Sequence, residues 1–239
     1  MFEYVKDARL AFSGALEKRI KTDLIVLHHS EGGAAETVQS IHEYHLSRGH
    51  KGIDYNICVL RNGDVYWGRG LEAVGGHVSN SWPKTAGVNA RSVGIVCLGN
   101  FNLGAMAEPQ FSALKRIVAD VVRRFGLDSA NRIATHREIA GEDYTDCPGS
   151  HFPVGAVRDF IRGGGNMEQE KENALVWKVC VDALNFREGP DLAAKVMRVL
   201  HRGDDVRLER YVAGEDWARV TVDGKAGWVW LRFIGEKGA

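Results

Sequence analysis

The most constraining feature of this sequence is a run of four apolar residues, LIVL at positions 24–27, which ends directly in His28 and His29. So short a run, rich in branched side chains, is typical of a β-strand that is buried on both faces of a sheet. In open α/β sheets, polar side chains at the carboxyl end of a central strand commonly belong to a functional site. The run therefore predicts an α/β domain with a candidate site at His28. The alternative is that the two histidines only mark the end of the strand.

The other patterns in residues 1–162 fit a mixed central β-sheet flanked by helices. Further strands are predicted at residues 53–60, 65–70, 92–98 and 131–135. Helices are predicted at residues 35–47, 108–126 and 152–162. Asn62-Gly63 is a hairpin turn signal between the first two of these strands. Residues 71–91 are rich in Gly, Asn and Ser, and a loop of this length in a compact domain is usually functional or disordered.

A change in composition near residue 163 predicts a second domain. Three consecutive glycines are followed there by a polar, charged stretch, as in flexible linkers. Short β-rich runs separated by turns then indicate a small all-β barrel. We therefore predict an α/β domain over residues 1–162, a linker over 163–174 and a small antiparallel barrel over 175–239. The chain of 239 residues is long enough for two hydrophobic cores.

Charge and cysteine content exclude several classes of protein. The net charge is zero and the pI is near 7.1, which argues against a nucleic-acid binder or a polybasic membrane anchor. The first 23 residues carry charges every few positions, so they predict neither a signal peptide nor membrane insertion. The four cysteines are widely spaced and imply no disulfide framework. We expect a protein that is made in the cytoplasm.

A possible metal site is formed by His136 and Cys147, eleven residues apart, together with His28. Neutral imidazole and thiolate are good zinc ligands, and three protein ligands with one open position is the arrangement of catalytic zinc. Both histidines are predicted to lie at strand ends. The alternative is that His136 has a structural role at a strand end and that Cys147 is a small buried apolar residue.

These residues lie in motifs that resemble the zinc-dependent N-acetylmuramoyl-L-alanine amidases of the type 2 amidase and peptidoglycan recognition protein family. The resemblance covers roughly residues 24–161, and its motifs follow the family's order. They are IVLHHS, the helix ending in YH, DYN followed by GDVYWGRG, VGGH, SVGIVCLGNF, and THREIA with DCPG. The C-terminal part resembles bacterial SH3-like wall-binding domains through LNFREGP and GKAGWVWLRFI. An amidase, a linker and such a module together resemble a phage or prophage endolysin.

The resemblance implies that the zinc ligands are His28, rather than His29, together with His136 and Cys147. It implies Zn²⁺ as the cofactor and bacterial peptidoglycan as the partner. The reaction expected is hydrolysis of the amide bond between N-acetylmuramic acid and L-alanine. Because no signal peptide is predicted, the enzyme would act on the wall after release, as endolysins do. The alternatives are a non-catalytic peptidoglycan-binding protein and a zinc peptidase that cuts another amide bond.

Four further residues receive candidate roles. Tyr55 matches a tyrosine beside the zinc whose hydroxyl would stabilise an oxyanion, with packing in the sheet as the alternative. Thr145 matches a position where relatives carry Lys or Thr, although the loop before Cys147 is longer than in many relatives. Arg69 and His77 are candidates for contact with the stem peptide or the sugar, and Arg69 is equally suited to a structural ion pair. No residue is assigned as the general base.

Two positions separate the chain from part of the family. Relatives that recycle wall fragments in the cytoplasm carry a catalytic Glu where this sequence has Val96, and usually Asp where it has Cys147. The chain is therefore expected to lie nearer the wall-lytic and recognition branch.

Overall fold

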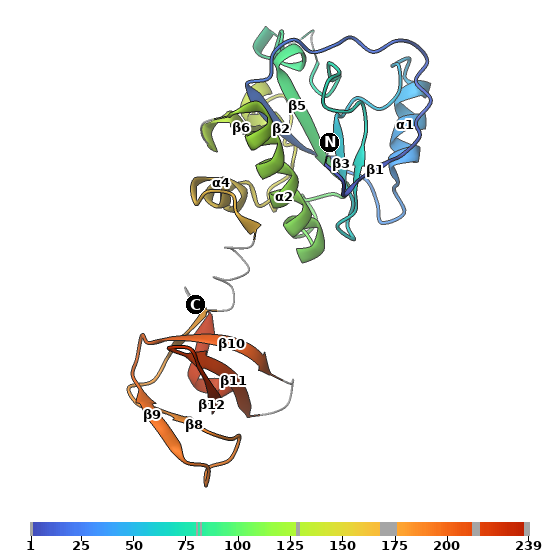
Figure 1. Cartoon of the computed structure of the whole chain (residues 1–239). Helices are drawn as coiled ribbons and strands as arrows, with labels where there is room; N and C mark the ends of the chain where they lie inside the picture. The colour runs from blue at the N-terminus through green and yellow to red at the C-terminus, as the bar shows by residue number, and fades with distance from the viewer. Residues whose placement is uncertain are drawn as a thin grey trace. The chain divides into compact units, whose positions relative to one another are not determined.

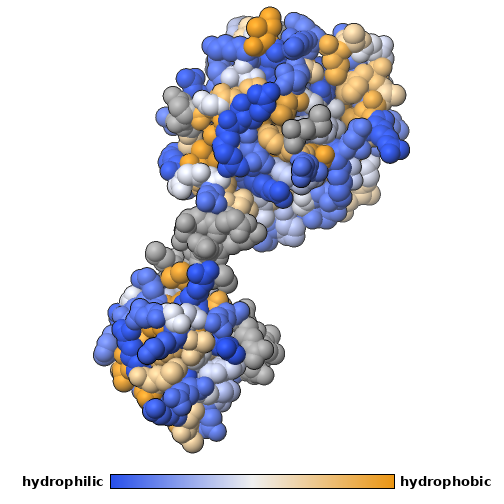
Figure 2. All heavy atoms as spheres, in the orientation of Figure 1, coloured by the Kyte–Doolittle hydropathy of each residue, from blue (hydrophilic) through white to orange (hydrophobic). Residues whose placement is uncertain are grey.

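The computed structural model describes residues 2–79, 81, 83–127, 130–167, 176–211 and 216–236. The chain divides into two compact units, Met1–Asn166 and Met167–Ala239, which run from blue to yellow and from orange to red in Figure 1. Hydrophilic residues cover most of the face of each unit seen in Figure 2, as expected where apolar side chains pack inside. None of the described helices combines the length and the apolar character that a membrane span requires.

The first unit is built on a six-stranded mixed sheet in the order β1-β4-β3-β5-β2-β6. Its strands are β1 (Val5–Asp7), β2 (Leu24–His29), β3 (Ile57–Val59), β4 (Val65–Trp67), β5 (Ser92–Cys97) and β6 (Ile133–Thr135). Strand β2 pairs in parallel with both β5 and β6, and β3 pairs antiparallel with β4. Every residue of β2 and β5 is buried, as predicted from their continuous apolar character.

Helices cover both faces of this sheet (Figure 1). The helices are α1 (Val38–Ser47), α2 (Glu108–Phe125), α3 (His136–Ala140) and α4 (Val154–Arg162), and the short 3-10 turns are η1 (Pro83–Thr85), η2 (Asn89–Arg91) and η3 (Ala130–Arg132). Helix α2 places Leu114 and Ile117 in the main core with Leu27 of β2. It ends at Gly126, whose left-handed φ of 61° is the conformation that glycine adopts most easily. The predicted α/β class with a mixed sheet is confirmed.

Three details differ from the sequence-based prediction. Strand β1, which pairs with β4, was not predicted, because only Val5 of its three residues is buried and no apolar pattern results. The strand predicted at residues 53–60 is confined to β3, so Tyr55 precedes the strand. Helix α3 was also missed, although Thr135 and Glu138 form a capping box at its start.

The second unit is all-β, as predicted. Its strands are β7 (Val176–Val179), β8 (Leu184–Arg187), β9 (Val196–Leu200), β10 (Asp205–Tyr211), β11 (Trp217–Val222), β12 (Lys225–Trp230) and β13 (Ile234–Glu236), with the turn η4 (Leu231–Phe233). They form an antiparallel sheet around a core that includes Phe186, Leu200 and Val229. Asp223 and Gly224 both have positive φ in the tight turn between β11 and β12. Residues 168–174 of the predicted linker lie outside the described residues, so the predicted domain boundaries stay a prediction.

Candidate metal centre

His28, His136 and Cys147 meet at one edge of the first sheet. Strands β2 and β6 are parallel neighbours in which Leu27 lies opposite Thr135. The residues that follow are His28, still in β2, and His136, the first residue of α3, so both histidines lie at the same edge. The ligand atoms of the three residues all lie within 4.8 Å of one another. Among the described residues, this is the one group of three or more His, Cys, Asp or Glu close enough to share an ion.

The alternation of side chains along β2 explains why His28, and not His29, faces this group. Val26 packs beneath the long loop that follows β4, whereas Leu27 packs with α2 on the opposite face. His28 lies on the same face as Val26. His29 lies on the α2 face, where its Nδ1 accepts a hydrogen bond from the backbone amide of Phe101 at 3.3 Å.

Cys147 is brought to the histidines by a loop whose two ends are tied together. The amide of Arg137 donates to the carbonyl of Cys147 at 2.8 Å, which closes the segment between them. The amide of Cys147 donates to Oγ1 of Thr145 at 3.1 Å, so Thr145 shapes the turn that carries the thiol. The Sγ atom then lies 3.7 Å from Nδ1 of His28.

The protonation of these side chains suits a metal with nitrogen and sulfur ligands. Burial lowers the pKa of His28 well below its ordinary value, and burial lowers that of His136 to about 4, so both imidazoles are neutral at pH 7. Burial raises the pKa of Cys147 to about 12, so the thiol keeps its proton until a cation displaces it.

One nitrogen in the group has no hydrogen-bond partner in the described part of the chain. Nε2 of His136 is buried and makes no hydrogen bond among the described residues. A buried polar atom without a partner is unfavourable unless a ligand satisfies it. An unpaired imidazole nitrogen beside a second imidazole and a thiol is the donor set that zinc prefers.

Tyr55 lies beside this group, with its ring centroid 5.3 Å from that of His28. Burial, reinforced by the nearby Cys147, raises the pKa of the phenol above its ordinary value, so Tyr55 is a hydrogen-bond donor at every physiological pH. Tyr55 also lines a cavity of about 390 Å³, with Glu36 and Tyr44 in its other walls. The carboxylate of Glu36 accepts a hydrogen bond from Ser30. Neither Glu36 nor Tyr44 was predicted as a site residue: Tyr44 was placed only in the helical pattern that ends in Tyr44-His45, and Glu36 lies in no motif.

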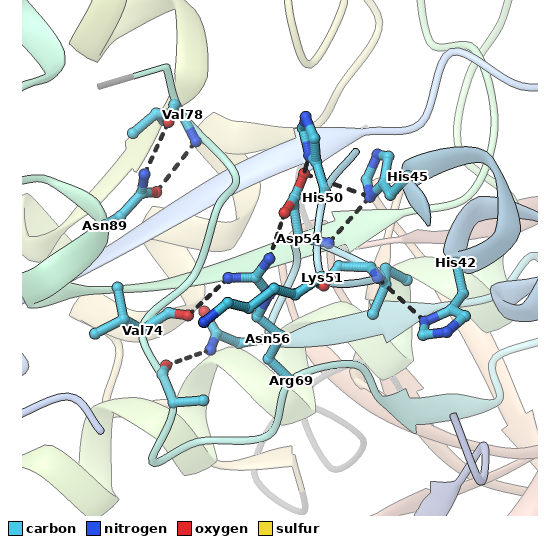
Figure 3. Close-up of polar contacts among 12 residues, drawn as sticks. His42, His45, His50, Lys51, Asp54, Asn56, Arg69, Val74, Val78 and Asn89 are labelled. Carbon is cyan, nitrogen blue, oxygen red and sulfur yellow. Dashed lines mark hydrogen bonds and ion pairs between the residues drawn. The ribbon is translucent and has the colours of Figure 1, made fainter. Parts of the chain in front are cut away.

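Arg69 is held by the protein itself. Its Nε donates to the carbonyl of Ile53 at 2.8 Å and its Nη1 to that of Val74 at 3.1 Å. Its Nη2 forms an ion pair with the carboxylate of Asp54. Figure 3 shows that Asp54 lies between Arg69 and His50 and contacts both. These bonds fasten the start of the long loop to the segment before β3. They agree with the structural alternative for Arg69, and its contact with the substrate stays a prediction.

His77 is also held on both sides. Its Nδ1 lies 3.0 Å from Nε2 of His28, and its Nε2 lies 3.1 Å from Oγ of Ser92. Nearby, the side chain of Asn89 accepts a hydrogen bond from the amide of Val78 and donates one to the carbonyl of Val78 (Figure 3). These two bonds hold together two distant parts of the long loop. Both ring nitrogens of His77 are therefore occupied inside the protein. Its predicted contact with the substrate stays a prediction.

The chain is similar to known proteins in both of its units. Residues 18–150 match the sequence profile of the family described as N-acetylmuramoyl-L-alanine amidase, and residues 182–235 match that of the bacterial SH3 domain. Peptidoglycan-recognition protein SC2 of Drosophila melanogaster is 34% identical over 135 residues, which are 53% of this chain and 68% of that protein.

Solved structures of N-acetylmuramoyl-L-alanine amidases are also similar to this chain. The endolysin N-acetylmuramoyl-L-alanine amidase LysCS of Clostridium intestinale URNW has a TM-score of 0.60 and 27% identity, over 68% of this chain and 97% of that one. The amidase LysC of the same organism has a TM-score of 0.58 and 28% identity, over 66% of this chain and 97% of that one. With a family profile that spans more than half of its length, the chain belongs to the N-acetylmuramoyl-L-alanine amidase family and also carries a bacterial SH3 domain.

Proposed function

We propose that this protein is a zinc-dependent peptidoglycan hydrolase that cleaves the amide bond between N-acetylmuramic acid and L-alanine. The observation that carries the proposal is the convergence of His28, His136 and Cys147, with one buried nitrogen of His136 left unpaired among the described residues. The names of LysCS and LysC as N-acetylmuramoyl-L-alanine amidases support the choice of bond.

In this proposal the two neutral imidazoles and the thiolate of Cys147 would hold the ion. Zinc bound by these residues would supply an activated water and polarisation of a carbonyl oxygen. Cys147 gives up its proton on binding, and its buried position keeps the competing bulk water away from the thiolate. The short segment tied by the bond from Arg137 to Cys147 fixes the distance between two of the three ligands.

Tyr55 and Thr145 are proposed to act on the oxygen of the scissile carbonyl. The phenol of Tyr55 keeps its proton and lies next to His28, so it can donate to negative charge that develops on that oxygen. Thr145 accepts from the amide of Cys147, which leaves the hydroxyl hydrogen of Thr145 for the substrate or the attacking water. The cavity that Tyr55 shares with Glu36 is the proposed place for the substrate beside the reacting bond.

The SH3 domain is proposed to bind the cell wall. A second binding module on one chain raises the local concentration of the catalytic unit at an insoluble substrate. We further propose that the enzyme reaches the wall after release from the cell in which it is made, in the manner of an endolysin.

The test is mass spectrometry of the soluble products that the full chain releases from purified sacculi, with zinc and after chelation. Stem peptides with a free L-alanine amino terminus, released only with the metal, are the expected result. Fragments cut within the peptide would mean a zinc peptidase instead. Binding to sacculi without any release would mean a recognition protein, as in the non-catalytic alternative.

A further inference from the structure

His77 and Ser92 form a chain of hydrogen bonds behind the candidate ligand His28. We propose that both are positioning residues, which keep the proton of His28 on Nε2 and so present the lone pair of Nδ1 to the metal. The inference rests on the proposed function for the identity of the metal, but the direction of the hydrogen bonds follows from the protein alone.

The chain of hydrogen bonds ends at the backbone carbonyl of Val88, which can only accept a hydrogen bond. This sets the direction of every hydrogen bond before it. Ser92 Oγ lies 2.7 Å from the carbonyl oxygen of Val88, so the single hydroxyl hydrogen of Ser92 must point to that oxygen. If it pointed elsewhere, two lone pairs would face each other in a buried place. Ser92 Oγ is therefore left as an acceptor toward His77.

The same reasoning then passes through the two imidazole rings. His77 must carry its proton on Nε2, because that nitrogen is 3.1 Å from the acceptor Oγ of Ser92. In a neutral imidazole the other nitrogen is then an acceptor, so Nδ1 of His77 receives the Nε2 proton of His28 across 3.0 Å. His28 is left with an unprotonated Nδ1, which is the atom 3.7 Å from Sγ of Cys147.

The ring of His77 is held in place by two glycines, which makes the arrangement specific. A Cβ atom at Gly94 of β5 would lie 2.2 Å from Cδ2 of His77, and one at Gly75 would lie 2.4 Å from the same atom. The backbone therefore approaches the ring more closely than any side chain would allow. His77 is only 6% exposed and Ser92 is fully buried, so water does not compete for these bonds.

A hydrogen-bond acceptor behind a metal-binding histidine commonly orients the ring and fixes its tautomer. Here the acceptor is a second neutral imidazole rather than a carboxylate. The tautomer of His28 is consequently set by Ser92. The effect passes through the imidazole of His77, which lies between the two residues and adds no negative charge. His77 has then a role in metal binding and not only in the wall of the neighbouring cavity.

The first experiment determines the tautomers of the full chain by ¹⁵N-histidine NMR in the metal-free protein. His28 and His77 are expected to carry their protons on Nε2, and the spectra of the variants assign the signals. A proton on Nδ1 of His28 would overturn the inference. Because this measurement needs neither zinc nor activity, it decides the inference even if the wild type releases no stem peptides and the proposed function fails.

The second experiment measures zinc affinity by competition with a chromogenic chelator. His77→Leu should weaken zinc binding by about 10- to 100-fold, the usual effect of losing an outer hydrogen-bond partner. His77→Asn should restore most of the affinity, since Oδ1 of an asparagine can take the place of Nδ1 as acceptor. Ser92→Ala keeps the imidazole of His77 but removes the acceptor that fixes its tautomer. It should therefore give a smaller loss of zinc affinity and a mixture of the two tautomers of His77.

The matched control is His42→Leu. His42 is as buried as His77, but its nitrogens bond to Ala11 and to the amide of Ile53, away from the metal group. This variant should lose stability and keep its zinc affinity. Zinc binding as tight as wild type in folded His77→Leu would overturn the inference. If His77→Leu does not fold, the inference would be overturned by a Ser92→Ala variant with the same histidine tautomers and the same zinc affinity as the wild type.

Discussion

The ring of His77 packs in a slot between the backbones of Gly75 and Gly94, which allows its position to be tested without changing any hydrogen-bonding group. The perturbation is Gly94→Ala, which adds one methyl group on the face of β5 that carries the ring. That methyl would lie 2.2 Å from Cδ2 and 2.4 Å from Cγ of His77. Carbon atoms in contact keep about 3.5 to 4.0 Å between them, so the ring must move by more than about 1 Å.

Such a shift exceeds what the two hydrogen bonds of His77 can absorb. They measure 3.0 and 3.1 Å, and hydrogen bonds of this kind weaken beyond about 3.2 Å. We expect Gly94→Ala to reduce zinc affinity by about 10- to 100-fold, or about 1.4 to 2.8 kcal/mol of binding free energy. Overpacking should lower the free energy of unfolding by about 1 to 3 kcal/mol.

Chelator competition gives the zinc affinity, and urea titration gives the free energy of unfolding. Gly155→Ala in α4 is the control, because a Cβ there meets no atom within 4 Å, and its stability should stay equal or rise by up to about 1 kcal/mol. In a His77→Ala background the added methyl has room, so Gly94→Ala should weaken zinc binding little further. Zinc affinity and stability equal to wild type in Gly94→Ala would refute the placement of the ring.

Four other predictions concern the first unit. Tyr55→Phe should lower the turnover of stem-peptide release by about two to three orders of magnitude, while the zinc content measured by elemental analysis stays unchanged. Cys147→Ala should lose zinc and peptide release but still sediment with sacculi through its SH3 domain, and chelation of the wild type should lower the melting temperature of the first unit, because the ion binds only the folded state. Burial and the hydrogen bond to Asp120 raise the pKa of Tyr4 above its ordinary value of 10. The folded state therefore holds this proton more tightly than the unfolded chain, so the stability that Tyr4 contributes is complete below about pH 10 and decreases above it. Urea titrations between about pH 9 and 11 should show a shallower decrease for Tyr4→Phe, and parallel curves would contradict this account.

The parts of the fold that were predictable are those in which the local pattern and the final burial agree. Strands β2 and β5 are continuous apolar runs and are buried on both faces, and α2 repeats its apolar residues at helical spacing. The meeting of His28 with His136 could also be expected, because parallel strands bring their carboxyl ends to one edge of the sheet.

The parts that were missed depend on partners distant in the sequence. Strand β1 is held by its pairing with β4 and leaves no periodic pattern in three residues. Helix α3 is too short for a periodic signal, although its capping box could have been recognised in THREIA. The role proposed for His77 could not be predicted, since its slot is formed by glycines from two segments and its hydrogen-bond chain ends at a backbone carbonyl.

The closed segment between Arg137 and Cys147 has a consequence for how fast a metal ion could be exchanged. Cys147 lies at one end of this segment, His136 directly precedes the other end at Arg137, and one backbone hydrogen bond joins the two ends. One route by which both ligands release an ion together is a local unfolding event that breaks this bond and opens the segment. The residence time of the ion would then be governed by the opening rate of the segment. Substitutions in the segment that leave every ligand intact would change how long the protein keeps a bound zinc ion in the presence of a chelator, even where its equilibrium affinity for zinc is the same.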